Sequence, residues 1–162
     1  MRAKNGSFTT VLFFICLLVS FSSSANETGN SDTAKGKYLV EIGGCNDCHT
    51  SGYAPSGGQV PEAKWLLGDG LGYRGPWGTT YPINLRDYIG KISEGEWVTK
   101  ARSLKARPPM PFWALNAMTE NDLRSIYKYI KSLGAGNNAV PDYVPPEKEP
   151  KGPYIQWPMP PK

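Results

Sequence analysis

Histidine is almost absent from this chain, which has one among 162 residues, and cysteine is scarce, with three. Such a composition leaves few ways to build a zinc site, because those sites take four ligands that are usually cysteine and histidine. A basic stripe is also missing. The net charge of +4 falls to +2 once residues 1–25 are set aside, since they contain Arg2 and Lys4 and no acid. The charge pattern therefore excludes the usual strongly basic nucleic-acid-binding surface.

The N-terminal segment has the layout of a secretory signal peptide. Two basic residues precede an apolar run at residues 11–21, and Ser23-Ser24-Ala25 supplies small residues for cleavage after Ala25. The run is shorter than the roughly 20 residues that span a membrane. We expect residues 1–25 to be removed together with Cys16, which leaves an exported chain without an integral membrane anchor. A retained N-terminal anchor is the alternative.

Helix signals fall in three places of the domain that we assign to residues 32–135, after a short segment at 26–31. Ser31-Asp32 is expected to cap a first helix that ends at Gly43-Gly44. Ser93-x-x-Glu96 is a capping box, and an apolar face follows it. The last helix starts at Thr119, with Asp122 as the capping acid, and stops at Gly134.

The remaining residues, 136–162, form a Pro-rich extended tail. It holds eight of the fifteen prolines, which exclude regular helix and central strand. Its aromatic residues suggest that it packs along the domain surface, because disordered segments are poor in aromatics; a mobile linker is the alternative.

Cys45-Asn46-Asp47-Cys48-His49 is a C-x-x-C-H motif, which is typical of covalent haem attachment. Each thiol can add to one vinyl group of a haem, and the adjacent imidazole can then bind the iron. An exported chain fits this chemistry, because bacteria attach haem outside the cytoplasm. The motif therefore predicts one haem c, with His49 as the proximal ligand.

Three other interpretations of the motif compete. A zinc site would need carboxylates to complete its ligands. A thioredoxin-like redox pair is expected in a βαβ setting, whereas here a helix and Gly-Gly come first. A disulfide between Cys45 and Cys48 would leave His49 without a role.

With one histidine, the chain cannot supply a second imidazole, so a thioether, a lysine or no residue fills the distal position. His/Met ligation raises the reduction potential of haem iron. Met110 lies between two prolines, which restrict its backbone and lower the entropy lost in placing its sulfur. Met118 precedes the cap of the last helix and is better explained by packing, while Met159 repeats the Pro-Met-Pro pattern in the tail. We favour Met110, with Met159 and Met118 as rivals.

At these residues the chain resembles the small class I cytochromes c of bacterial periplasms, over about residues 32–134. Gly36 with the C-x-x-C-H motif, residues 81–85, and Arg107-Pro108-Pro109-Met110-Pro111 with the last helix resemble the family's first helix, haem-edge loop and ligand-methionine region. Gly36 would then permit a close crossing near Tyr127 and Tyr129. The resemblance implies an all-α fold of three or more helices and long loops around one covalent haem. The tail and residues 52–73 depart from the minimal family pattern.

Further assignments concern the surroundings of the haem. The carbonyls of Pro55 and Pro61 are candidates for the bond that orients a proximal histidine. Donors that could contact the haem propionates are Tyr73, Arg74, Trp77, Tyr81 and Trp97.

The sequence thus favours a periplasmic electron carrier rather than an enzyme, with transient redox partner proteins such as a dehydrogenase, an oxidase or another cytochrome. Four lysines could steer an acidic partner: Lys37, Lys91, Lys100 and Lys105. A haem subunit of a periplasmic dehydrogenase complex, with the tail as a tether, is the main alternative. A haem enzyme or gas sensor with an open distal site would need a catalytic acid or base that no second histidine can supply.

Overall fold

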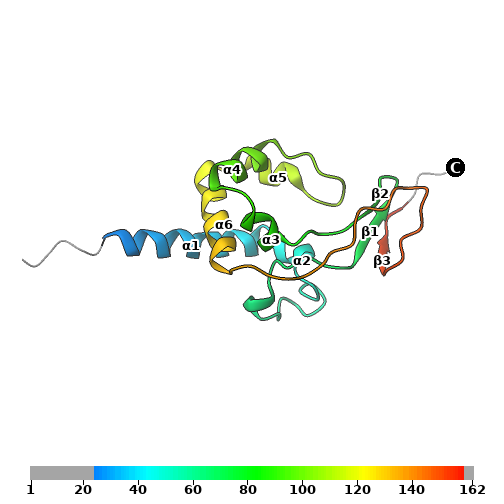
Figure 1. Cartoon of the computed structure of the whole chain (residues 1–162), viewed down its shortest axis with the longest axis horizontal. Helices are drawn as coiled ribbons and strands as arrows, with labels where there is room; N and C mark the ends of the chain where they lie inside the picture. Colours follow the sequence, from blue (N-terminus) through cyan, green and yellow to red (C-terminus); the bar gives the residue numbers. More distant parts are fainter. Residues whose placement is uncertain (1–23, 159–162) are drawn as a thin grey trace, which may run out of the picture.

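A computed structural model describes residues 24–158, so the apolar run at 11–21, Cys16 and Met159 lie outside the described residues. Helices form the main body, and a small sheet lies to one side of it (Figure 1). The helices are α1 (Ser24–Ile42), α2 (Cys45–His49), the 3-10 turn η1 (Glu62–Lys64), α3 (Leu85–Gly90), α4 (Glu94–Ser103), α5 (Phe112–Ala117) and α6 (Glu120–Ser132). The strands are β1 (Gly72–Gly75), β2 (Gly78–Thr80) and β3 (Tyr154–Gln156). Over 24–158, no helix is long and apolar enough to cross a membrane.

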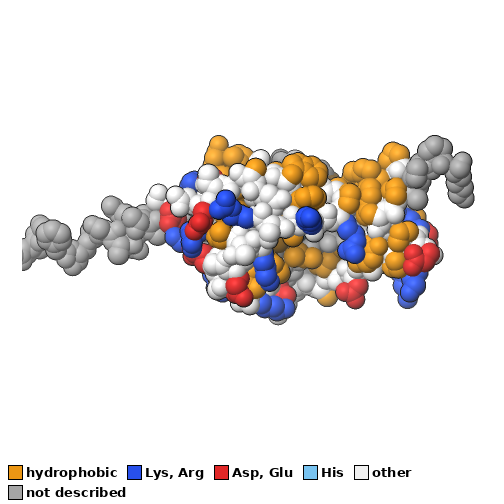
Figure 2. Space-filling model, turned by 90° about the horizontal axis from the view of Figure 1, so that it is seen from above, with side chains coloured by type: hydrophobic (Ala, Val, Ile, Leu, Met, Phe, Trp, Pro, Cys, Tyr) orange, Lys and Arg blue, Asp and Glu red, His pale blue; other side chains and the backbone are white. Residues whose placement is uncertain are grey.

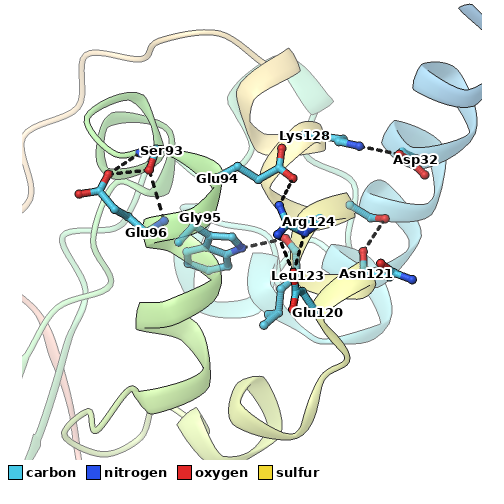
Figure 3. Close-up of polar contacts among 12 residues, drawn as sticks. Asp32, Ser93, Glu94, Gly95, Glu96, Glu120, Asn121, Leu123, Arg124 and Lys128 are labelled. Atoms are coloured by element: carbon cyan, nitrogen blue, oxygen red, sulfur yellow. Dashed lines mark hydrogen bonds and ion pairs between the residues drawn. The ribbon is translucent and has the colours of Figure 1, made fainter. Parts of the chain in front are cut away.

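The expected helix starts hold for two helices and fail for the first. Capping boxes are present at Ser93 with Glu96 and at Thr119 with Asp122. The expected cap at Ser31-Asp32 was wrong, because α1 already begins at Ser24. The Asp32 carboxylate forms an ion pair with Lys128 of α6 at 2.6 Å, so it fastens two helices instead of capping one (Figure 3).

The closest helix crossing is between α1 and α6. A Cβ built at Gly36 would overlap the backbone carbonyl of Ser125 and lie 2.7 Å from Cβ of Tyr129. The expected close approach at Gly36 is therefore confirmed, with Ser125 and Tyr129 as its neighbours. Glycine is needed here because the obstacle is backbone, which cannot turn aside as a side chain does.

Replacing Gly36 by alanine is expected to lower the free energy of unfolding by about 2–3 kcal/mol, because the added methyl forces α1 and α6 apart. Gly95→Ala in α4 is the matched control, since a Cβ there meets no atom within 4 Å. That variant should be unchanged or more stable by up to about 1 kcal/mol. Chemical denaturation of both variants measures the difference, and equal stabilities would contradict the crossing.

The core lies around α6, against which α1, α3 and α4 pack. Its buried apolar side chains are Val40, Trp65, Leu66, Ile89, Trp97, Val98, Ala101, Leu115, Leu123, Ile126, Tyr129 and Ile130. The indole N–H of Trp97 donates to the Leu123 carbonyl at 2.8 Å, and Arg124 pairs with Glu94 at 2.7 Å (Figure 3). The capped helices are thus fastened together by packing and by polar contacts across α4 and α6.

The expected all-α fold of helices and long loops did not include the small sheet, of order β2-β1-β3, that the structure contains. β1 and β2 form an antiparallel hairpin, and β3, from the tail, pairs with β1 in parallel. The glycines of this hairpin leave its strands without an alternating apolar pattern, so the sequence did not predict them. The structure nevertheless requires glycine there. A Cβ at Gly78, where φ is +94°, would lie 2.5 Å from the Val144 carbonyl oxygen.

The tail packs on the domain, as its aromatic residues suggested. Its prolines leave β3 as an edge strand. In Figure 2 apolar side chains gather at the end of the molecule that carries the sheet. The large apolar side chains of the tail that are exposed to solvent are Tyr143, Tyr154, Ile155 and Trp157.

Candidate functional site

The C-x-x-C-H motif forms a helix of its own. α2 starts after Gly44, whose φ of +65° lets the chain turn out of α1, and it ends at His49. Cys45 and Cys48 are three positions apart on this helix, which places their side chains on one face. Both are free thiols and half-buried. The two cysteines and the histidine therefore form one rigid unit.

The state of Cys45 bears on the competing interpretations of the motif. Burial raises the pKa of its thiol to about 11, so Cys45 is protonated at neutral pH. A catalytic redox cysteine normally has a lowered pKa, so Cys45 is unlike the reactive thiol of a thioredoxin-like pair. Within residues 24–158, moreover, no group of three or more His, Cys, Asp or Glu side chains is placed to hold a metal ion.

His49 is held at two points. Its Nδ1 lies 2.8 Å from the Ile83 carbonyl oxygen, and its own carbonyl accepts the Gly68 N–H at 2.8 Å. Because a carbonyl only accepts, Nδ1 carries the proton and the lone pair lies on Nε2. Burial lowers the pKa of the ring, while the bond to Ile83 acts more weakly in the opposite direction. The imidazole is thus neutral, with Nε2 available to a metal.

The expectation that Pro55 or Pro61 supplies the orienting carbonyl was wrong. Ile83 supplies it, 34 positions after His49. The Pro61 carbonyl instead accepts the Lys64 N–H at 2.8 Å, which closes η1. The resemblance of residues 81–85 to a haem-edge loop was the only sequence signal that pointed to this segment.

Asn46 and Thr50, which the sequence analysis did not single out, fix the position of α2. Thr50 Oγ1 donates to Asn46 Oδ1 and accepts the Leu66 N–H, both at 2.7 Å. The Leu66 carbonyl in turn accepts the Leu85 N–H at 2.9 Å. Through these bonds α2 is joined to Leu66, in the loop that follows η1, and Leu66 is joined to the first residue of α3. An Asn and a Thr four positions apart around the motif were the available signal.

Two of the three candidate methionines lie in the described part of the chain. Met110 and Met118 are both half-buried against the core, at either end of α5. Met110 belongs to a loop that β2 fastens, since Thr80 Oγ1 donates to the Pro108 carbonyl at 2.9 Å. Met118 lies near the end of α1, where a Cβ built at Gly43 would be 3.7 Å from its Cε. The same Cβ would lie 3.8 Å from Cys45 Sγ, so Met118 also lies near α2, and the assignment of the distal ligand to Met110 stays a prediction.

The five expected propionate contacts are not brought together. Tyr73 and Trp77 lie on the β1–β2 hairpin, and the Tyr73 hydroxyl donates to Cys48 Sγ at 3.5 Å. Tyr81 packs on Gly72. The single donor of Trp97 is already bonded to Leu123 inside the core.

Arg74 points to the other face of the hairpin, where it pairs with Glu149 at 2.9 Å. Whether any of the five contacts a propionate stays a prediction. The structure separates Trp97, which lies in the core, from the other four residues, which lie on or next to the β1–β2 hairpin.

Three of the four lysines that were expected to steer an acidic protein contact other side chains of this chain. Lys37 pairs with Glu62 at 2.6 Å and Lys91 with Asp87 at 2.7 Å. Lys100 lies 5.7 Å from the centre of the Tyr88 ring. The charges of Lys37 and Lys91 are therefore locally balanced, which weakens their part in steering.

The donor set fits a haem c. Two half-buried thiols on one helical face, a neutral imidazole with Nε2 available and a thioether are the groups that this cofactor uses. On the motif helix itself, Asn46 Nδ2 is buried and has no hydrogen-bond partner among residues 24–158. Unpartnered buried polar atoms are uncommon and are typical of sites that receive a further group.

Comparisons with known proteins give a distant likeness to one kind of subunit. Over 165 aligned residues, or 88% of the chain, it is 26% identical to the cytochrome c subunit of a quinone alcohol dehydrogenase from Gluconacetobacter polyoxogenes. The corresponding subunit of Komagataeibacter europaeus gives the same values. The chain spans only about a third of the length of these relatives, since the match covers 31% of each.

No family model and no solved structure matches the chain. The likeness to these subunits supports the cytochrome c resemblance coarsely. Both relatives are named as a cytochrome c subunit, which agrees with the prediction that the chain is an electron carrier and not itself an enzyme.

Proposed function

We propose that the chain is an electron-transfer protein of the periplasm. It carries one electron on a single haem c bound to Cys45 and Cys48, with His49 and Met110 as axial ligands. The observation that carries this proposal is the neutral His49 ring, oriented by Ile83 beside two half-buried thiols. We further propose that the helices and loops adopt the small cytochrome c fold.

Each part of the chain has a distinct role in this proposal. When bound, the haem supplies a one-electron iron couple. Cys45 and Cys48 hold it covalently, so that it does not dissociate in either redox state. The Ile83 carbonyl keeps the proton on Nδ1 of His49, which orients the ring and raises its basicity as a ligand. The Met110 thioether favours the reduced state and raises the potential.

The partner is proposed to be a redox protein, which the chain meets through a small and weak interface. The names of the relatives favour a dehydrogenase as that partner, either as a transient donor or as a permanent complex. The proposal of export rests on the signal-peptide layout of residues 1–25.

Covalent attachment gives the first test. The full chain is produced with a cytochrome c maturation system, denatured and separated on a gel that is stained for haem. We expect one haem per chain to remain with the polypeptide, and none with the Cys45→Ser/Cys48→Ser variant. Haem that separates from the wild-type chain on denaturation would overturn the proposal.

The distal position separates an electron carrier from a haem enzyme or sensor. The ferrous protein should keep its spectrum under carbon monoxide, because Met110 occupies the site that the gas would take. Rapid binding of carbon monoxide would favour an open site. Co-elution with a dehydrogenase from the source cells would identify the permanent subunit, whereas a monomer would identify the free shuttle.

A further inference from the structure

The first part of the Pro-rich tail, residues 136–144, runs from the end of α6 past the loops around α2 to the sheet (Figure 1). We call this segment the tail strap. A tether to another protein would hang free of the domain, but this segment is bonded to it at two places. Its hydrogen bonds go to residues beside those that hold His49, and to the β1–β2 hairpin, which contacts the loop before Met110.

On the His49 side, the strap fastens the two segments that grip the ring and its backbone. The Asn138 side chain donates to the Leu67 carbonyl at 3.0 Å, next to Gly68, whose N–H binds the His49 carbonyl. The Asn84 side chain, next to Ile83, donates to the Gly136 carbonyl at 2.9 Å. Each residue that holds His49 therefore has a neighbour bonded to the strap.

Close packing strengthens this connection. A Cβ at Gly68 would lie 2.5 Å from Cγ2 of Val140 and 2.8 Å from the backbone nitrogen of Asn84. Asn84 is buried, and its Oδ1 also accepts the Asp87 N–H as the cap of α3. The strap, Gly68 and Asn84 thus form a filled contact with no room for adjustment.

On the Met110 side, the strap makes one direct contact and one through β2. Arg107 is three positions before Met110 in the sequence, and its guanidinium lies 3.9 Å from the centre of the Tyr143 ring. The Tyr143 hydroxyl donates to the Trp77 carbonyl at 2.9 Å. Val144 exchanges backbone hydrogen bonds with Thr79, at 2.7 and 3.0 Å, and the next residue of β2, Thr80, holds the Met110 loop.

We infer that the tail strap positions both axial ligands, with Asn138 acting on His49 and Tyr143 acting on Met110. This inference rests on the proposed function. A thioether binds iron weakly, so the Met110 bond depends on how little its loop moves when the sulfur leaves. A loop fastened to Tyr143 and β2 stays near the iron and lets the sulfur rebind before another ligand enters.

The Met110 side is tested on the haem-loaded full chain by adding imidazole to the ferric protein. The rate of loss of the sulfur-to-iron charge-transfer band measures how often Met110 leaves. We expect Tyr143→Ala to raise this rate at least tenfold, and Tyr143→Phe, which loses only the hydroxyl, to raise it a few-fold. Tyr154→Ala is the matched control, because Tyr154 is equally exposed, at 37% against 38%, and bonds to Glu149 instead.

The His49 side is tested by solvent exchange of its Nδ1 proton, followed by NMR. Asn138→Ala should speed this exchange about tenfold, whereas Asn137→Ala, at the exposed neighbouring position, should leave it unchanged. If Tyr143→Ala yields no holoprotein, Tyr143→Phe and Asn138→Ala decide the matter.

Provided that the wild-type protein has the sulfur-to-iron band, the inference is overturned if each variant and its control show equal rates of band loss and of Nδ1 proton exchange. A wild-type protein without that band would instead overturn the proposed Met110 ligation. The two failures are therefore distinguishable.

Discussion

Without haem, the chain is expected to lose its cooperative thermal unfolding transition and a large part of its native helix content. Most of the buried apolar core residues belong to α4 and α6, and residues 50–84 contribute only Trp65 and Leu66 to it. Residues 50–84 contain only η1 and the hairpin as regular structure. A covalently held haem would supply the apolar centre around which these segments pack.

Two features of the site make the cost of removing haem large. Among the described residues, Asn46 Nδ2 on the motif helix is buried without a partner, and such a group costs about 1–3 kcal/mol. Cys45, Met110 and Met118 are only half-buried against the core, so they gain apolar contact from a group placed between them. Since a domain is stable by only about 5–15 kcal/mol, the loss of this contact is enough to prevent cooperative folding.

The measurement compares circular dichroism and calorimetry of the holoprotein with those of Cys45→Ser/Cys48→Ser made without haem. Added haemin is the control, because non-covalent binding should restore part of the transition if the substitutions themselves are harmless. A haem-free chain with native helix content and one cooperative melt would contradict the prediction.

Local signals in the sequence located several elements correctly. The capping boxes at Ser93 and Thr119 and the stop at Gly134 depend on residues within one or two turns, which the sequence displays directly. Asn84 with Asp87 is a similar signal, since Asn84 caps α3, but it was passed over in a segment assigned to a loop. The six-residue helix α5 was missed as well, because Pro111 precedes it and provides no side-chain cap.

Contacts between residues far apart in the sequence could not be predicted from local sequence patterns. β1 and β3 pair although they are about eighty positions apart, and neither has the alternation of a half-buried strand. The Ile83 carbonyl reaches His49 because Gly68, Leu66 and the tail strap bring their loops together. The identity of a carbonyl partner depends on backbone position alone, so no side-chain type marks it in the sequence.

Met110→Ala is expected to abolish the sulfur-to-iron band and to lower the reduction potential by on the order of 100 mV or more, since axial ligands set haem potentials over about 0.8 V. Carbon monoxide should then bind the ferrous iron rapidly. Met118→Ala is the matched control. It removes a half-buried side chain near Gly43 and should lower the free energy of unfolding by about 1–3 kcal/mol, with the band and the potential unchanged.

Met159→Ala completes this series, because the fold gives the rival methionine more weight than its place near the terminus suggests. Trp157, two positions earlier, has its ring centre 6.0 Å from that of Tyr73, and the Tyr73 hydroxyl contacts Cys48 Sγ. The end of the described tail is thus fastened beside α2. A band that survives Met110→Ala and disappears in Met159→Ala would assign the distal ligand to the tail. The opposite result would leave Met110 as the ligand and the tail as the support of its loop.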